Sequence, residues 1–244
     1  KTNEFLDLID QHLEENKFIP WEGTLREYIE MVIKNPKIHM NAHKRTLKMI
    51  ESHGVEKDED GAIQNYKFFD EELFGVNAPI QELLSYLRAA AAGSEVGRRI
   101  LLLYGPTSSG KSQLAILLKR GLEAFSKTDE GAVYCLSEST MFEDPLTAIP
   151  RDLRKKFSTK YGIKIDGELS PLMSTILKET YGGKIMDLPV RRYLFSEKDR
   201  KGIGTFVPSD KKSQDISELV GSMDLSTIGQ YGSESDPRAY RFDG

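Results

Sequence analysis

The glycine-rich stretch GPTSSGKS, at residues 105–112, sets the strongest limits on the fold of this 244-residue chain. It directly follows the apolar run at residues 100–104, which predicts a short strand buried on both faces. Beyond the stretch, leucine and phenylalanine side chains recur at steps of three and four as far as Phe125. This spacing predicts a helix that begins near Lys111. The sequence therefore places a glycine-rich turn between a buried strand and a helix.

The chemistry of this turn predicts a phosphate site. The first N–H groups of a helix have no partner within the helix, and they lie at the positive end of its dipole. Glycines let the backbone close around an anion at this point. The spacing G-x-x-x-x-G-K-S adds the ammonium of Lys111 to reach the β- and γ-phosphates, and the hydroxyl of Ser112 to hold Mg²⁺. The sequence therefore predicts a nucleoside triphosphate site.

Composition narrows the class of protein and its partners. The formal net charge of −4 argues against a general nucleic-acid surface, so nucleic acid is not expected as a partner. A single cysteine, Cys135, can form neither an intrachain disulfide nor a cysteine cluster for a metal, which indicates a reducing, cytoplasmic location. No stretch approaches the roughly 18 apolar residues of a membrane span, and the first residues do not resemble a signal peptide. No membrane association is expected.

The pattern along the chain predicts two regions. Residues 1–60 predict a small N-terminal helical region, in which T-x-x-E forms a capping box between Thr24 and Glu27. The acidic stretch at residues 55–65 is poor in apolar side chains and predicts a linker. We place the domain boundary there, so that residues 61–244 form the nucleotide-binding domain.

The remaining segments predict an α/β domain. A second apolar strand is expected at residues 131–137, and strand, helix and strand in succession predict a parallel sheet with the nucleotide at its carboxyl edge. Further helices are expected within residues 144–162 and 170–183, followed by a strand at 184–190.

Two acidic and two histidine side chains need to be weighed as metal ligands. Asp166 and Asp187 each follow apolar residues, as the Mg²⁺-assisting aspartate of a P-loop ATPase does, but both apolar runs are short and neither aspartate is followed by an acid. We interpret both as turn residues. His39 and His43 are spaced i, i+4, but no carboxylate or cysteine completes a metal set, so surface histidines are expected.

Two groups of basic side chains are candidates for contact with ATP bound to a neighbouring subunit. The γ-phosphate of that ATP could be reached by Arg191 with Arg192, or by Arg154 with Lys155 and Lys156. Charged residues on helices and strands are more often solvated, and this is the interpretation that we favour.

Several stretches resemble the bacterial PrkA family, whose members are known as serine protein kinases that carry an AAA+ type ATPase domain. The resemblance covers nearly the whole chain. It rests on WEGTLREYIEMVIKNPKIHMNAHKRTLKMIESHG, on ELFGVNAPIQELLSYLRAAAAG followed by ILLLYGPTSSGKSQLAILLKRGLE, and on ELSPLMSTIL and QDISELVGSMDLSTI. The last two are much more specific than a P-loop alone.

The resemblance implies a three-layer αβα P-loop NTPase of the AAA+ type, with ATP or ADP and Mg²⁺ as cofactors. It also implies homo-oligomers and a protein substrate. The phosphate cradle implied by the resemblance consists of Gly105, Pro106, Thr107, Ser108, Ser109 and Gly110. The resemblance implies Lys111 as the cation, Ser112 as the Mg²⁺ ligand and Gln113 as a further nucleotide-binding residue. The implied turn that flanks adenine consists of Phe74, Gly75 and Val76.

The sequence assigns no catalytic residue. In the PrkA family the catalytic acid and the sensor residues follow the stretch DPRAYRFDG, so the domain is expected to be incomplete at its C-terminus. The resemblance implies an ATP-dependent enzyme that phosphorylates serine in proteins. Two alternatives remain open: an AAA+ motor acting on protein substrates, for example in ATP-dependent proteolysis, and a nucleotide-gated regulatory module.

Overall fold

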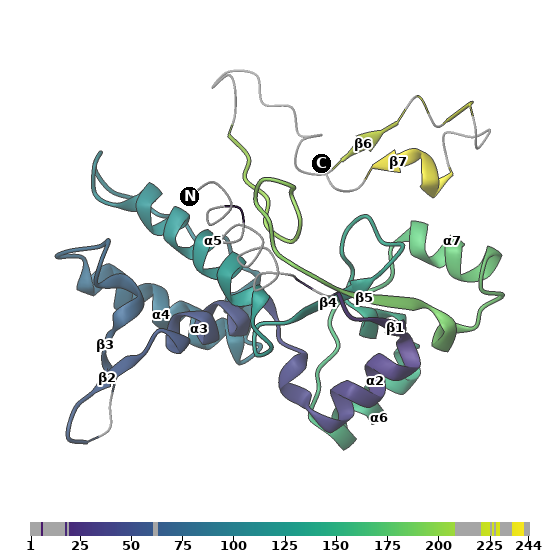
Figure 1. Ribbon diagram of the computed structural model, residues 1–244, viewed down its shortest axis with the longest axis horizontal. Coiled ribbons are helices and arrows are strands. Elements are labelled where there is room, and N and C mark those ends of the chain that lie inside the picture. Colours follow the sequence, from purple (N-terminus) through teal and green to yellow (C-terminus); the bar gives the residue numbers. More distant parts are fainter. Residues whose placement is uncertain are drawn as a thin grey trace.

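The architecture comes from a computed structural model and is organised around two hydrophobic cores. One core lies between three helices, and the other lies between a small sheet and its covering helices. Figure 1 shows the two groups of elements on opposite sides of the molecule. The structure describes residues 6, 18, 20–60, 63–207, 221–224, 226, 228–229 and 236–241.

The first core lies between α3 (Ala42–Ser52), α4 (Asn77–Ala91) and α5 (Lys111–Lys127). Helix α3 packs against both of the others. Gly121 allows the close approach of α3 to α5, because a Cβ at this position would lie 2.6 Å from Sδ of Met49. The helix that follows the glycine-rich turn is thus held by packing along its length, which positions the turn at its N-terminus.

The second core is built on a three-stranded antiparallel sheet. The strand order is β1 (Glu22–Thr24), β5 (Pro189–Tyr193), β4 (Val133–Leu136). The central strand β5 pairs antiparallel with both neighbours. Val190 of β5 is fully buried in the core between the sheet and the surrounding helices.

Three helices contribute to this second core: α2 (Leu25–Lys34), α6 (Arg151–Tyr161) and α7 (Pro171–Glu179). The predicted capping box of α2 is confirmed, because the Thr24 backbone N–H donates to Oε2 of Glu27 at 2.7 Å and the Thr24 hydroxyl accepts the Glu27 N–H. The helices expected within residues 144–162 and 170–183 are confirmed as α6 and α7.

Short elements complete the described chain. Strands β6 (Ser222–Met223) and β7 (Tyr240–Arg241) form an antiparallel pair. The 3-10 helices are Pro36–Ile38, Lys67–Phe69, Glu95–Arg98, Pro145–Ala148, Ile185–Asp187 and Pro237–Ala239.

The strand expected at residues 100–104 is not found. This segment has no regular structure and makes no backbone hydrogen bond to any described strand. Its side chains are exposed, with Ile100 and Tyr104 each at 95%. A strand buried on both faces needs a hydrogen-bonding neighbour and a cover on each face, and nothing among the described residues supplies these.

The prediction of a parallel sheet is also wrong. The strand expected at residues 131–137 is present as β4, but its partner is β5 and the pairing is antiparallel. The sheet also lies at the far end of α5 from the glycine-rich turn (Figure 1). Because α5 has 17 residues, the two ends of the helix are roughly 25 Å apart. The mixture of helices and strands fits an α/β P-loop fold, but the described sheet does not carry the turn on its carboxyl edge.

Two parts of the acidic stretch at residues 55–65, which was predicted to be a linker, form strands. Strands β2 (Val55–Lys57) and β3 (Ile63–Tyr66) pair antiparallel in a hairpin, whose residues 61 and 62 lie outside the described part. Contacts also cross the boundary placed after residue 60, because β1 pairs with β5 and α3 packs on α4 and α5. The boundary itself stays a prediction.

We expect the first cuts in limited proteolysis to fall within residues 55–65, because exposed polar backbone is the preferred site of nicking. Residues 56–60 are exposed, and Glu56 and Glu59 offer sites for a glutamate-specific protease. The pairing of β1 with β5 should keep the two pieces together in native gel filtration and release them in denaturant. First cuts in another region would contradict the prediction.

Candidate functional site

The turn at residues 105–112 has the backbone expected of a phosphate-binding loop. Helix α5 begins at Lys111, as the sequence predicts, and Gly110 precedes it as the N-cap with φ +83°. Ser108 also has a positive φ, +61°. The first intrahelical bond runs from Leu114 N to Gly110 O at 2.8 Å, so the N–H groups before Leu114 have no partner within the helix. These N–H groups are available to an anion.

The Lys111 side chain lies against the loop that precedes it. Its Nζ donates to Gly105 O at 2.9 Å, to Ser109 Oγ at 3.1 Å and to Pro106 O. The ammonium is therefore held within the turn. This is where a cation is needed if phosphate oxygens approach the helix N-terminus.

Two hollows adjoin the loop. One is a largely apolar groove of about 500 Å³, lined by residues of the loop, by one face of α4 and by residues 101–104. The other is a polar depression of about 300 Å³, lined by residues 108–113. Apolar walls suit a flat ring system, whereas the polar depression suits phosphates and hydrated ions.

Of the three residues expected to flank adenine, the structure brings one into the groove. Val76, the N-cap of α4, lines it together with Gly105, Pro106, Ser109, Gly110 and Lys111. Gly75 has φ +71°, and Phe74 is 79% exposed; neither lines the groove. Thr107 is exposed at the tip of the loop.

Ser112 fits a role as a single Mg²⁺ ligand. Its side chain is exposed and lines the polar depression. The described residues contain no group of three or more His, Cys, Asp or Glu side chains that could hold a metal by themselves. Mg²⁺ bound with nucleotide commonly takes one or two protein oxygens and completes its shell with phosphate oxygens and water, so one hydroxyl is compatible with this ion.

The two aspartates weighed as Mg²⁺ ligands lie elsewhere. Asp166 is 66% exposed and pairs with Lys164 at 3.3 Å. Asp187 ends the 3-10 helix Ile185–Asp187. Neither lines either hollow beside the loop, which agrees with their interpretation as turn residues.

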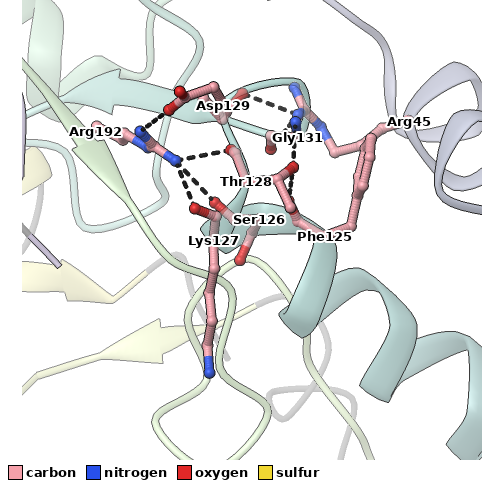
Figure 2. A network of polar contacts seen from close by, with 9 residues as sticks. Arg45, Phe125, Ser126, Lys127, Thr128, Asp129, Gly131 and Arg192 are labelled. Carbon is pink, nitrogen blue, oxygen red and sulfur yellow. Dashed lines mark hydrogen bonds and ion pairs between the residues drawn. The ribbon is translucent and has the colours of Figure 1, made fainter. Parts of the chain in front are cut away.

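The interpretation of Arg192 as a solvated charge is wrong. Its Nη2 donates to Thr128 O at 2.8 Å and to Lys127 O at 3.0 Å, and its Nη1 lies 3.2 Å from Oδ1 of Asp129 (Figure 2). These carbonyls lie at the C-terminus of α5, where the helix dipole favours a cation. Arg192 thus joins β5 to the end of the helix that begins at the loop.

Arg154 is also engaged with the backbone of its own chain. Its guanidinium donates to the carbonyls of Ile149, Thr147 and Gly167 at 2.7 to 2.8 Å. The side chain therefore holds together the segments on both sides of α6. In this conformation neither Arg154 nor Arg192 is free to reach a neighbouring subunit.

Sequence reasoning missed the role of Arg45. This residue of α3 is 6% exposed, and its Nη1 donates to Gly131 O at 2.8 Å and to Ala132 O at 2.9 Å. Figure 2 shows it on the other side of the α5–β4 turn from Arg192. A signal was present, because Arg45 is four residues from Met49 and so falls on the buried face of α3.

The expectation of surface histidines is wrong for His39. Its side chain is only 14% exposed, and Nε2 lies 2.6 Å from Oδ2 of Asp144. His43 packs its ring against Tyr86. The two histidines therefore have separate partners in the fold.

The family described as "PrkA AAA domain" matches residues 23–244, which include the loop, α5 and both cores. The chain belongs to the PrkA family. An AAA domain binds ATP or ADP, so membership implies nucleotide binding.

Two curated members of the family match almost the whole chain. The chain is 51% identical over 242 residues to "ATP-dependent protease PrkA" of Bacillus subtilis, covering 99% of the chain and 38% of that protein. It is 30% identical over 241 residues to "Serine/threonine kinase YeaG" of Escherichia coli K12, covering 91% of the chain and 36% of that protein. The chain thus spans less than two fifths of each relative. No solved structure matches it.

Among the described residues, no helix combines the length and apolar character that crossing a bilayer requires.

Proposed function

We propose that this chain binds Mg²⁺ and ATP with its P-loop at residues 105–112. The observation that carries the proposal is the loop geometry, in which Gly110 opens α5 in the left-handed region and the Lys111 ammonium lies within the turn. Backbone N–H groups and Lys111 would hold the β- and γ-phosphates, and Ser112 would ligate Mg²⁺. The adenine would enter the apolar groove beside Val76.

We further propose that the domain adopts the three-layer αβα arrangement of AAA+ proteins and assembles into homo-oligomers. The exposed apolar side chains at residues 100–104 support an additional layer, since large exposed apolar patches mark surfaces that become covered. We place the protein in the cytoplasm, because its single cysteine is a buried free thiol.

We propose that the domain couples ATP binding and hydrolysis to phosphorylation of serine in a protein substrate. The name of the Escherichia coli relative, a serine/threonine kinase, supports this function. The name of the Bacillus subtilis relative, an ATP-dependent protease, favours the alternative of an ATP-driven motor in proteolysis, and that relative has the higher identity of the two. In a nucleotide-gated regulatory module, ATP binding would order the domain for a partner and turnover would be incidental.

The three functions differ in the fate of the γ-phosphate. The protein, at the full length of its relatives, is incubated with γ-labelled ATP and a candidate protein substrate. Label on serine supports the kinase, and free phosphate with loss of intact substrate supports the motor in proteolysis. Bound ATP with little turnover, neither labelled serine nor lost substrate, supports the regulatory module. Absence of ATP binding would contradict all three.

Replacing Ser112 with alanine should weaken binding of Mg-ATP by about ten-fold and leave metal-free ADP almost unchanged, because the hydroxyl would contact the ion rather than the nucleotide. Calorimetric titration of both ligands measures the difference. Ser85→Ala, which changes an exposed serine of α4 outside both hollows, is the matched control. Equal weakening of both ligands would assign the hydroxyl another role, such as contact with phosphate.

A further inference from the structure

The two parts of the candidate site come from segments that are distant in the sequence, and they are joined by direct contacts. Glu72 and Leu73 immediately precede the turn that leads to Val76. The Gln113 side-chain amide donates from Nε2 to Oε2 of Glu72. Since Gln113 lies in the first turn of α5, this hydrogen bond connects the segment before α4 to the helix that opens at the P-loop.

Leu73 makes the second contact. It is 9% exposed, and its Cδ2 lies 3.3 Å from the position that a Cβ on Gly110 would occupy. The Leu73 side chain therefore rests against the P-loop glycine. It also belongs to the core that includes Ile80 of α4 and Leu117 of α5, so the contact is anchored in both helices.

We propose that Glu72 is a positioning residue for nucleotide binding, acting through Gln113. The hydrogen bond holds the segment that carries Val76 beside the phosphate loop, so that the wall for the base and the cradle for the phosphates are in place before the ligand arrives. This inference rests on the proposed ATP site. A ligand that contacts both parts binds more tightly when they are already positioned, because the cost of ordering them is not incurred on binding.

The arrangement leads to different expectations for two ligands. ATP spans the groove and the loop, so its affinity depends on how they are held together. Inorganic tripolyphosphate contacts the loop alone, and the loop's own N–H groups and Lys111 remain when Glu72 is changed. Loss of the contact should therefore lower the affinity for ATP and leave the affinity for tripolyphosphate almost unchanged.

The experiment compares four variants of the full chain by calorimetric titration with Mg-ATP and with Mg-tripolyphosphate. Glu72→Ala removes the carboxylate, Glu72→Asp keeps the charge but is shorter by one methylene, and Glu72→Gln keeps the length and one acceptor oxygen. Glu71→Ala changes the exposed neighbouring glutamate as a control. We expect Glu72→Ala and Glu72→Asp to lower the affinity for ATP about ten-fold, and the ATP affinity of Glu72→Gln to stay within about three-fold of the unaltered chain. The affinity for tripolyphosphate should change less than about two-fold in every variant.

Three results would overturn the inference: unchanged ATP affinity in Glu72→Ala and Glu72→Asp, equal weakening of both ligands, or a Glu72→Gln variant as weak as Glu72→Ala. Thermal melting verifies that each variant is folded, and if Glu72→Ala is not, the comparison of Asp with Gln decides. Failure of the unaltered chain to bind either ligand would instead refute the nucleotide site itself.

Discussion

Replacing Lys111 with alanine should lower the affinity for ATP by about ten-fold to a hundred-fold while the chain remains folded. The side chain is a single cation within the P-loop turn, and hydrogen bonds to charged groups contribute roughly 1.5–3 kcal/mol each. The substitution also removes the donors to Gly105 O and Ser109 Oγ, which loosens the loop that must close around the phosphates. Calorimetric titration with Mg-ATP measures the loss.

Lys127→Ala is the matched control for this variant. It removes an exposed lysine from the last turn of the same helix, at the opposite end from the loop, and so changes the net charge by the same amount. We expect its ATP affinity to stay within about two-fold of the unaltered chain, because exposed charges separated by more than the Debye length of about 8 Å are largely screened. Unchanged affinity in Lys111→Ala, or equal loss in both variants, would contradict the proposed site.

Replacing Arg45 with methionine should lower the free energy of unfolding by about 2–5 kcal/mol. Methionine keeps the apolar stem but leaves the carbonyls of Gly131 and Ala132 without their donor, and each buried acceptor left unsatisfied costs about 1–3 kcal/mol. Arg45 joins α3 to the turn between α5 and β4, so its loss also weakens the connection between the two cores (Figure 2).

Unfolding in urea, followed by circular dichroism, measures the effect. Lys44→Met is the control, since it places the same side chain at an exposed position of α3. We expect that control to change the free energy of unfolding by less than about 0.5 kcal/mol. A loss below about 1 kcal/mol in Arg45→Met would mean that water replaces the guanidinium at the two carbonyls.

Features that depend on near neighbours along the chain could be predicted from the sequence. The capping box of Thr24 and Glu27 and the start of α5 after Gly110 are as predicted, because caps and helical turns form between residues at most four apart. Helices α6 and α7 follow from the same local spacing. Membership of the PrkA family was also recognisable, since several stretches of residues carry it.

Which distant segments meet could not be predicted from the sequence, because it depends on how the helices and strands pack. An apolar run predicts a strand but not its partners, and so β4 pairs antiparallel with β5 while residues 100–104 pair with no described strand. The sequence likewise does not predict the distant partners of long polar side chains. Arg45 reaches a carbonyl 86 residues away and Gln113 reaches Glu72 across 41 residues. Their partners are set by how helices and strands pack, because a guanidinium or an amide can bond to any acceptor that packing brings within reach.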